Sequence, residues 1–167
     1  MISDQAVALV DIARSTFGVA EAEYLALDVQ EKFPFSDGAF DLILATMLFN
    51  ELPLGALRQA VRECRRILAP GGRLLATVAH PAMIYALAKK GVLTDFGRGL
   101  FAMPSAGGLR LPVARRSVEA YQTALAEAGF VVTLEDVSPN AKTLGEKPGL
   151  TLPRNTPMAL ICDCQRM

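Results

Sequence analysis

The sequence predicts an α/β fold built around a mainly parallel sheet. Two apolar runs, residues 40–46 and 73–79, are typical of strands that are buried on both faces of such a sheet. An amphipathic helix over residues 54–68 separates the two runs, and the connections are short. Strand and helix alternate in this way along much of the chain, which is the pattern of parallel strands joined by helical crossovers.

The N-terminal segment predicts one helix followed by one short strand. Ser3 can cap a helix over residues 4–17, in which apolar side chains recur at helical spacing. Residues 23–27 then predict a short strand that ends at Asp28.

The central segment predicts a strand, a helix and a second strand. Residues 40–46 form the first apolar run, and Pro70, Gly71 and Gly72 end the helix that follows it. The apolar face of that helix consists of Leu57, Val61, Cys64 and Leu68.

The second half of the chain predicts a substrate region and two further strands. Residues 91–112 are rich in glycine and proline and lack periodicity, which indicates a long loop or lid within a substrate region of about residues 81–115. The predicted elements are a helix at 81–90, the loop at 91–112, a helix at 117–128, a strand at 130–137, a loop at 138–157 and a strand at 158–164.

Composition and charge exclude several classes of protein. The 167 residues include 17 basic and 17 acidic side chains, so the formal net charge is zero, and 51% of the residues are hydrophobic. This balance excludes intrinsic disorder and offers no basic surface for general nucleic-acid binding. No signal peptide is visible, and the longest apolar stretch, residues 74–88, is too short to span a membrane. We expect one cytoplasmic domain over residues 1–167, with neither nucleic acid nor membrane as a partner.

The cysteines do not form a metal site or a disulfide framework in this pattern. Cys64 lies in the predicted helix, whereas Cys162 and Cys164 share one face of the last strand. His80 is the only histidine, so no second pair of ligands completes a zinc site. We expect buried thiols in a reducing compartment and no bound metal.

Four segments occur together in the order found in one protein family. EYLALDV (23–29), FPFSDGAFDLILATMLFNELP (33–53) and RILAPGGRLLATV (66–78) resemble the middle of a class I S-adenosylmethionine-dependent methyltransferase of the small-molecule type. The segment RSVEAYQTALAEAGFVV (116–132) continues the resemblance more loosely. The resemblance implies a Rossmann-like sheet with a final antiparallel strand, S-adenosylmethionine as the cofactor, and a small-molecule acceptor.

The resemblance also implies which residues face the cofactor. Asp28 would accept a hydrogen bond from the adenine amino group, and the backbone N–H of Val29 would meet a ring nitrogen. Judged from the local sequence without the resemblance, Asp28 could equally cap the turn that follows it. Ala45, Thr46 and Met47 lie where the family places the methionine part of the cofactor, and ordinary packing at a strand end is the alternative.

Candidates for the acceptor side follow the two apolar strands. Asn50 and Tyr85 are candidate substrate residues, although loop capping and packing would also explain them. His80 follows the second apolar strand and is a candidate general base, against the alternative of a structural histidine. Arg110, Arg115 and Arg116 lie near the predicted lid and could receive an anionic substrate, but charged residues near a loop are usually solvated.

One part of the family pattern is absent from the printed sequence. No first strand with a glycine-rich loop of the form E/D-x-G-x-G-x-G occurs upstream of Asp28, and the strand that should carry the ribose-binding acid is also missing if residues 4–17 are helical. A rival interpretation makes residues 6–12 that strand, with Asp11 as the acid. We prefer the helix, because only residues 13–22 would remain for a parallel crossover.

The sequence therefore predicts an N-terminally incomplete, truncated methyltransferase sheet. In the family's strand order, 3-2-1-4-5-7-6, the strands at 23–27 and 40–46 would be separated by a gap. Three arrangements are open: the two strands pair directly, the first docks elsewhere, or another chain fills the space. The last of these implies a homo-oligomer or a complementing chain. Methyl transfer to a small molecule is the first hypothesis, with the isolated chain inactive for lack of the glycine-rich loop. A non-catalytic remnant or partner subunit is the alternative, and a nicotinamide-dependent Rossmann enzyme is weaker.

Overall fold

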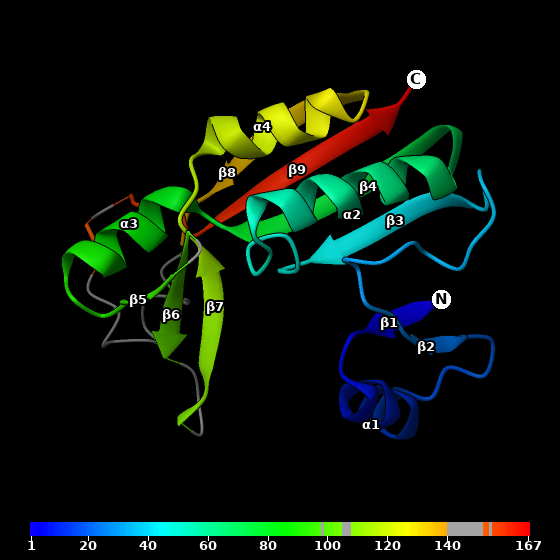
Figure 1. The fold of residues 1–167 in the computed structure, drawn as a ribbon, viewed down its shortest axis with the longest axis horizontal. Coiled ribbons are helices and arrows are strands. Elements are labelled where there is room, and N and C mark those ends of the chain that lie inside the picture. The colour runs from blue at the N-terminus through cyan, green and yellow to red at the C-terminus, as the bar shows by residue number, and fades with distance from the viewer. Residues whose placement is uncertain (98, 105–107, 140–151, 154) are drawn as a thin grey trace. The chain divides into compact units, whose positions relative to one another are not determined.

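The computed structural model describes residues 1–97, 99–104, 108–139, 152–153 and 155–167. The chain divides into two compact units, Met1–Phe35 and Ser36–Met167, which we describe separately (Figure 1). Most of the loop predicted at 138–157 lies outside the described residues.

The first unit is a small strand–helix–strand motif. Strand β1 (Ile2–Asp4) pairs in parallel with β2 (Tyr24–Ala26), and α1 (Val7–Phe17) connects them. The predicted helix is confirmed, but its cap is not Ser3: the N-cap is Ala6, whose N–H donates to the Asp4 carboxylate at 2.8 Å.

Two predictions for this unit need correction. The expectation that no strand precedes the helix is wrong, because Ile2–Asp4 pairs with Tyr24–Ala26. Three residues are too few to show the alternation that identifies a strand in a sequence, and all three are exposed. The rival strand at residues 6–12 is also wrong, since α1 occupies most of that segment.

The second unit is centred on a four-stranded sheet in the order β3-β4-β9-β8. The strands are β3 (Phe40–Thr46), β4 (Leu68–Ala79), β8 (Phe130–Val137) and β9 (Ala159–Arg166). Only β3 and β4 pair in parallel, whereas β9 is antiparallel to both of its neighbours. The final antiparallel strand is therefore confirmed. The description of the sheet as mainly parallel is corrected to mixed, because inserting β9 between β4 and β8 makes two of the three pairings antiparallel.

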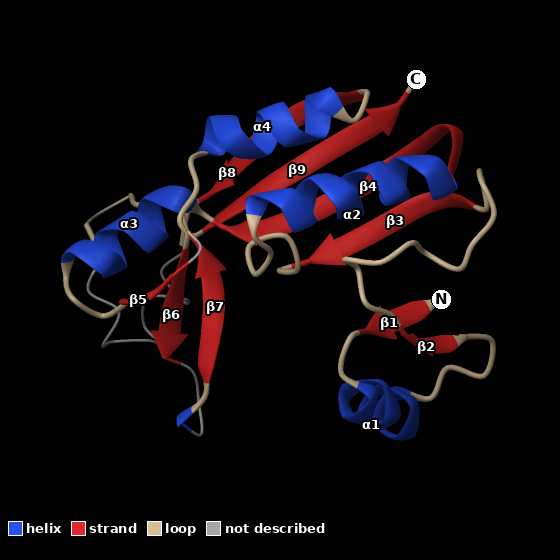
Figure 2. Ribbon diagram, in the orientation of Figure 1, coloured by secondary structure: helices blue, strands red, loops and turns tan. Residues whose placement is uncertain are grey.

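Helices α2 (Leu54–Ile67) and α4 (Val118–Glu127) cover one face of this sheet (Figure 2). Side chains of β4 and β9 that point to this face are fully buried, among them Leu74, Leu160 and Cys162. The predicted apolar face of α2 packs here, and Leu57 and Val61 are completely inaccessible. Burial of this apolar surface is the main favourable contribution to the stability of the unit.

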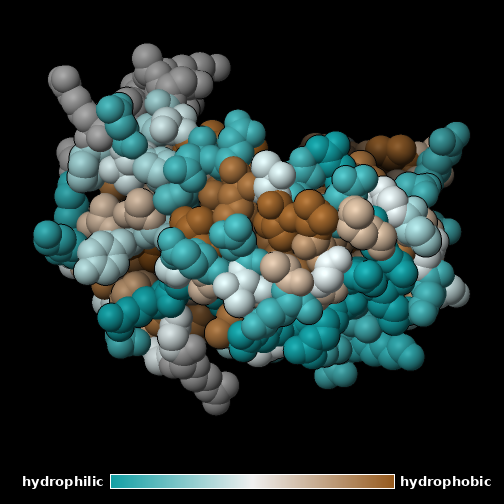
Figure 3. Space-filling view, turned by 90° about the horizontal axis from the view of Figure 1, so that it is seen from above, coloured by the Kyte–Doolittle hydropathy of each residue, from teal (hydrophilic) through white to brown (hydrophobic). Residues whose placement is uncertain are grey.

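The opposite face of β3 is open in the described structure. Leu42 and Leu44 alternate with Ile43 and Ala45 and are 51% and 66% exposed. Because β3 is an edge strand of the four-stranded sheet, one side of its backbone has no partner strand among the described residues. Figure 3 shows a second feature of the surface, a different face seen from above, on which hydrophobic residues are gathered near the middle with hydrophilic ones around them.

The predicted lid contains more regular structure than the sequence suggests. After α3 (Pro81–Lys89), strands β5 (Thr94–Gly97), β6 (Leu100–Pro104) and β7 (Arg110–Ala114) form a three-stranded antiparallel sheet. The prediction of a long loop over residues 91–112 is wrong, because strands of four or five residues leave no clear periodicity. Gly97 and Gly99, at the facing ends of β5 and β6, have φ values of 78° and 76°, which suit glycine.

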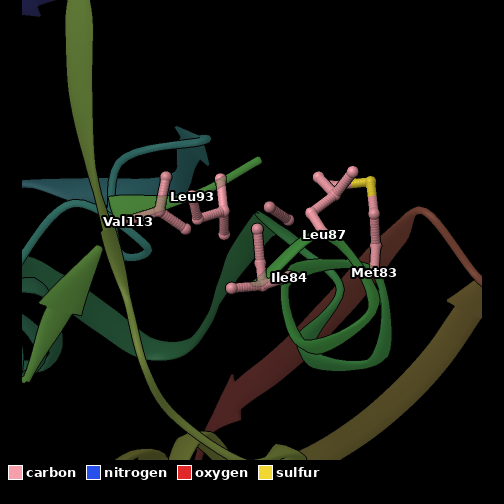
Figure 4. Close-up of a cluster of buried hydrophobic side chains, with 6 residues drawn as sticks. Met83, Ile84, Leu87, Leu93 and Val113 are labelled. Atoms are coloured by element: carbon pink, nitrogen blue, oxygen red, sulfur yellow. The ribbon is translucent and has the colours of Figure 1, made fainter. Parts of the chain in front are cut away.

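A second small core fixes this insertion to α3. Figure 4 shows Ile84 and Leu87 of α3 facing Leu93 and Val113, with Met83 beside them. The position of α3 is therefore determined by apolar packing against β7 and the turn before β5. Among the helices that the structure describes, none is long and apolar enough to cross a membrane.

Candidate active site

The candidate site of the second unit lies at the carboxyl ends of β3 and β4. Ligands of open α/β sheets bind at this edge, and the pairing of the two strands ends at Thr46 and Thr77. The N–H of Met47 donates to the Thr77 carbonyl at 2.8 Å, which extends the pairing by one residue.

Met47 has a left-handed backbone conformation, with φ of 55°. A residue with a side chain adopts this conformation at a cost of about 1–2 kcal/mol. Of the predicted cofactor residues in this unit, Thr46 and Met47 are exposed. Ala45 is only 6% exposed and packs on the face covered by helices. The strand end therefore presents Thr46 and Met47 at the surface and keeps Ala45 in the core.

Asn50 connects three segments below the site. Its side-chain oxygen accepts a hydrogen bond from the Ala79 N–H at 3.3 Å, and its carbonyl accepts one from the Ala114 N–H at 2.6 Å. The residue is 3% exposed. Asn50 thus holds the loop after β3 against the ends of β4 and β7.

His80 caps α3 and has both ring nitrogens engaged. The Ala82 N–H donates to Nδ1 at 3.0 Å, and Nε2 lies 3.1 Å from a carboxylate oxygen of Asp136. Because Nδ1 accepts, the hydrogen-bond network assigns the ring proton to Nε2, which donates to Asp136. The Pro81 that follows suits the first position of a helix, where a backbone N–H has no partner.

A cavity of about 470 Å³ opens beside His80. Its volume lies within the range of small-molecule sites. The lining residues come from the start of α3, from β6 and from the segment that leads into α4: His80, Pro81, Ala82, Ile84, Tyr85, Phe101, Arg115, Arg116, Ser117 and Val118. Tyr85, predicted as a substrate residue, lines the cavity and is 72% exposed, whereas Asn50 is not among the lining residues.

The two arginines of the cavity differ in their surroundings. Arg116 donates to the carbonyls of Phe49 and Leu52 at 3.2 and 2.7 Å, and its guanidinium lies 4.8 Å from the Tyr121 ring centroid. Burial lowers the pKa of Arg116 and raises the pKa of Tyr121 to about 12. Arg115 is exposed, and its guanidinium lies 5.8 Å from the centroid of the Phe101 ring.

The remaining predicted cofactor residues lie in the first unit. One carboxylate oxygen of Asp28 accepts a hydrogen bond from the Gln30 N–H at 2.9 Å, which is the turn-capping role considered for this residue. Val29 is buried. The positions of Asp28 and Val29 are therefore known only within this unit.

Several site features were not predictable from local sequence. Asp136 is the partner of His80 across 56 positions in the chain, and the Arg116 bonds connect residues more than 60 positions apart. No short-range pattern indicates such pairs. Among the described residues, no group of three His, Cys, Asp or Glu side chains is arranged to hold a metal ion.

Comparisons with known proteins agree on one fold. Residues 2–76 match a family model described as a methyltransferase domain. No curated protein matches the sequence. The fold is similar to that of an S-adenosylmethionine-dependent methyltransferase from Mesorhizobium loti, with 18% identity, a TM-score of 0.68, and coverage of 98% of this chain and 78% of that one.

Two further structures show the same likeness. A candidate S-adenosylmethionine-dependent methyltransferase from Listeria monocytogenes is 15% identical, with a TM-score of 0.76 and coverage of 99% of this chain and 78% of that one. A structure from Haloferax volcanii, of a complex between the Trm112 methyltransferase activator and a candidate methyltransferase, is 16% identical, with a TM-score of 0.65 and coverage of 98% and 69%. The methyltransferase resemblance stated from the sequence is confirmed: the chain has this fold.

Proposed function

We propose that this chain, which has the fold of the S-adenosylmethionine-dependent methyltransferases, transfers a methyl group from S-adenosylmethionine to a small-molecule acceptor. The observation that carries the proposal is the methyltransferase-domain match over residues 2–76, which includes Asp28 and the surface end of β3 at Thr46 and Met47. The cavity beside His80 opens at the same carboxyl edge of the sheet and supports an acceptor of small-molecule size.

The residues of the first unit fit the adenine end of the cofactor. One carboxylate oxygen of Asp28 is used by the Gln30 N–H, and the second has no partner among the described residues. The Val29 N–H likewise makes no hydrogen bond within the part of the chain that the structure describes. One acceptor and one neighbouring donor are what an adenine amino group and an adjacent ring nitrogen require.

S-adenosylmethionine also needs contacts along its ribose and methionine parts. The resemblance implies Ala45, Thr46 and Met47 for the methionine part, and we assign it to the two of these that are exposed, Thr46 and Met47. Residues 1–28 contain a single glycine, Gly18, so they do not supply a glycine-rich loop. We propose that the isolated chain binds the cofactor weakly and transfers methyl groups slowly, because the backbone contacts of that loop are absent from it.

The chemistry requires mainly alignment of the acceptor. Bound S-adenosylmethionine supplies an electrophilic methyl group. The cavity residues of this chain orient the acceptor atom and exclude water from it. We keep His80 as the candidate base, because it lines the cavity; to take a proton at Nδ1 it would have to release the Ala82 N–H.

A matched pair of Asp28 variants tests the cofactor role. Asp28→Asn keeps an oxygen for the Gln30 N–H but replaces the second acceptor with an NH2 group, so the affinity for S-adenosylhomocysteine should fall about tenfold, the effect of losing one good hydrogen bond. Asp11→Asn, on the exposed surface of α1, should leave it unchanged. Equal affinities for Asp28→Asn and the unmodified chain would refute the adenine assignment.

A second candidate function is that of a non-catalytic partner subunit. The open edge of β3 and the exposed Leu42 and Leu44 favour a second copy or a complementing chain at this strand. Light scattering on the purified chain across a range of concentrations tests it: Leu44→Lys should shift an assembled species toward the monomer. A monomer at every concentration, with methyl transfer intact, would contradict the partner role.

A further inference from the structure

The cavity beside His80 has apolar walls that suit a flat ring. Ile84 and Tyr85 come from α3, Phe101 comes from β6, and Val118 begins α4. Both aromatic rings and the aliphatic side chains offer contact area to a planar ligand without any hydrogen bond. Among the lining residues that the structure describes, none carries a carboxylate, so these walls do not favour a cationic ligand.

Among the charged side chains that the structure describes around the cavity, the Arg115 guanidinium is the one available to a ligand. The guanidinium of Arg116 is held by the carbonyls of Phe49 and Leu52 and is partly buried. Both ring nitrogens of His80 are engaged, one by the Ala82 N–H and the other by the Asp136 carboxylate. Arg115 is exposed and has no ion pair among the described residues, while its backbone N–H donates to the Gly99 carbonyl at 2.8 Å. The backbone position of Arg115 is thus fixed against the β-insertion, and its guanidinium remains open to a ligand.

We infer that this cavity binds an aromatic carboxylate, with the ring between Tyr85 and Phe101 and the carboxylate on the Arg115 guanidinium. A guanidinium matches a carboxylate with two parallel hydrogen bonds. Arg116 also lines the cavity, but both of its terminal nitrogens already donate to carbonyls, so the fork that a carboxylate can meet with two hydrogen bonds is that of Arg115. The inference rests on the proposed function in one respect, namely that this ligand is the methyl acceptor.

Two probes of nearly the same shape, one with a carboxylate and one with a neutral amide, test the inference. Calorimetry with 4-hydroxybenzoate and with the uncharged 4-hydroxybenzamide, on the full chain without cofactor, should show the acid binding at least about tenfold more tightly, as expected for a charge-assisted hydrogen-bonded pair. Equal affinities, or no binding of either probe, would overturn the inference.

Two substitutions separate the charge from the walls. Arg115→Gln should lower the affinity for the acid to that for the amide and leave the amide unchanged, whereas Tyr85→Ala should weaken both. Arg110→Gln is the matched control, because Arg110 bonds to Thr94 and does not line the cavity. Both arginines are exposed, so the fold should be retained. If Arg110→Gln lowers the affinity for the acid as much as Arg115→Gln does, the loss comes from general surface charge, and the inference is overturned.

The same samples distinguish this inference from the proposed function. Titration with S-adenosylhomocysteine should give the same affinity for Arg115→Gln as for the unmodified chain. Binding of the acid without any binding of S-adenosylhomocysteine would support the carboxylate site and refute the methyltransferase proposal. Binding of S-adenosylhomocysteine without any binding of the acid would support the methyltransferase proposal and refute the carboxylate site.

Discussion

At the scale of single residues, the candidate site is determined by buried hydrogen bonds more than by free catalytic groups. Asn50 and His80 are both nearly inaccessible and both bond to backbone N–H groups. A sequence identifies such residues as polar positions at strand ends, which is how both became candidates. Their partners, Ala79 and Ala82, contribute only backbone atoms, so no residue pattern could predict these bonds.

The capping role of His80 makes a prediction that differs from that of a base. His80→Ala should lower the free energy of unfolding by about 1 kcal/mol, because α3 loses its side-chain cap. His80→Asn restores a capping oxygen and should recover most of this loss. Urea unfolding of both variants measures these changes in the free energy of unfolding. If methyl transfer is also recovered in His80→Asn, the ring is a cap; if it stays abolished while stability is recovered, the ring acts as a base.

The three buried thiols predict a loss of stability in alkaline solution. Burial raises the pKa of Cys64 and Cys164 to about 12 and that of Cys162 to about 11, from an ordinary value near 9.0. Above pH 9 the unfolded chain releases these protons and the folded chain retains them. The free energy of unfolding should therefore fall by on the order of 1 kcal/mol per thiol for each pH unit between about 9 and 11.

Urea unfolding at pH 8 and pH 10 measures this dependence. A Cys162→Ala, Cys164→Ala variant should show a smaller fall between the two pH values than the unmodified chain. The same fall in both proteins would assign the effect to other groups, such as surface lysines.

At the scale of elements, β9 stabilises the end of α2. A guanidinium nitrogen of Arg166 donates to the carbonyls of Arg65 and Arg66 at 2.9 and 3.2 Å, and also to that of Leu68. These carbonyls lie at the C-terminus of α2, where the helix dipole favours a positive charge. The bonded residues lie about 100 positions apart in the chain, and nothing in the local sequence of either element predicts this contact.

Removing that contact should destabilise the second unit. Arg166→Met keeps most of the side-chain length but no donor, so the free energy of unfolding should fall by about 2 kcal/mol. Gln165→Met, the exposed neighbour on β9, is the control and should change it by less than about 0.5 kcal/mol. Chemical denaturation measures the free energy of unfolding of both variants. Equal values for Arg166→Met and Gln165→Met would show that water molecules replace Arg166 as donors to the carbonyls of α2.

Elements with strong patterns were predictable and short ones were not. The apolar run of β3 and the strand β8 have the predicted bounds, and α2 ends within one residue of its prediction. The three-residue β1 and the strands of the insertion were missed, because pairing partners and not their own composition determine them. Of the candidate site, the strand ends could be located from sequence, whereas the cavity depends on contacts between α3, β6 and the start of α4.

At the scale of the whole molecule, the two units differ in how much structure supports them. The first unit has two three-residue strands and one helix, with Val10 its only buried helical residue. The second contains the four-stranded sheet and most of the buried side chains. Local opening requires little free energy where few apolar contacts are buried.

Hydrogen exchange should therefore separate the units. Backbone amides of β1, α1 and β2 should exchange much faster than those of β4 and β9, and mass spectrometry of peptides from each region measures the difference. Added S-adenosylhomocysteine should slow exchange around Asp28. Equal protection of both units would show that the first is as cooperative as the second.

Calorimetric titration of the full chain with S-adenosylhomocysteine tests the central claim, that this methyltransferase fold binds its cofactor through Asp28. We expect weak, saturable binding that Asp28→Ala abolishes in a protein that keeps the circular dichroism spectrum of the unmodified chain. Absence of any binding to the folded, unmodified chain, or binding that survives Asp28→Ala unchanged, would contradict it.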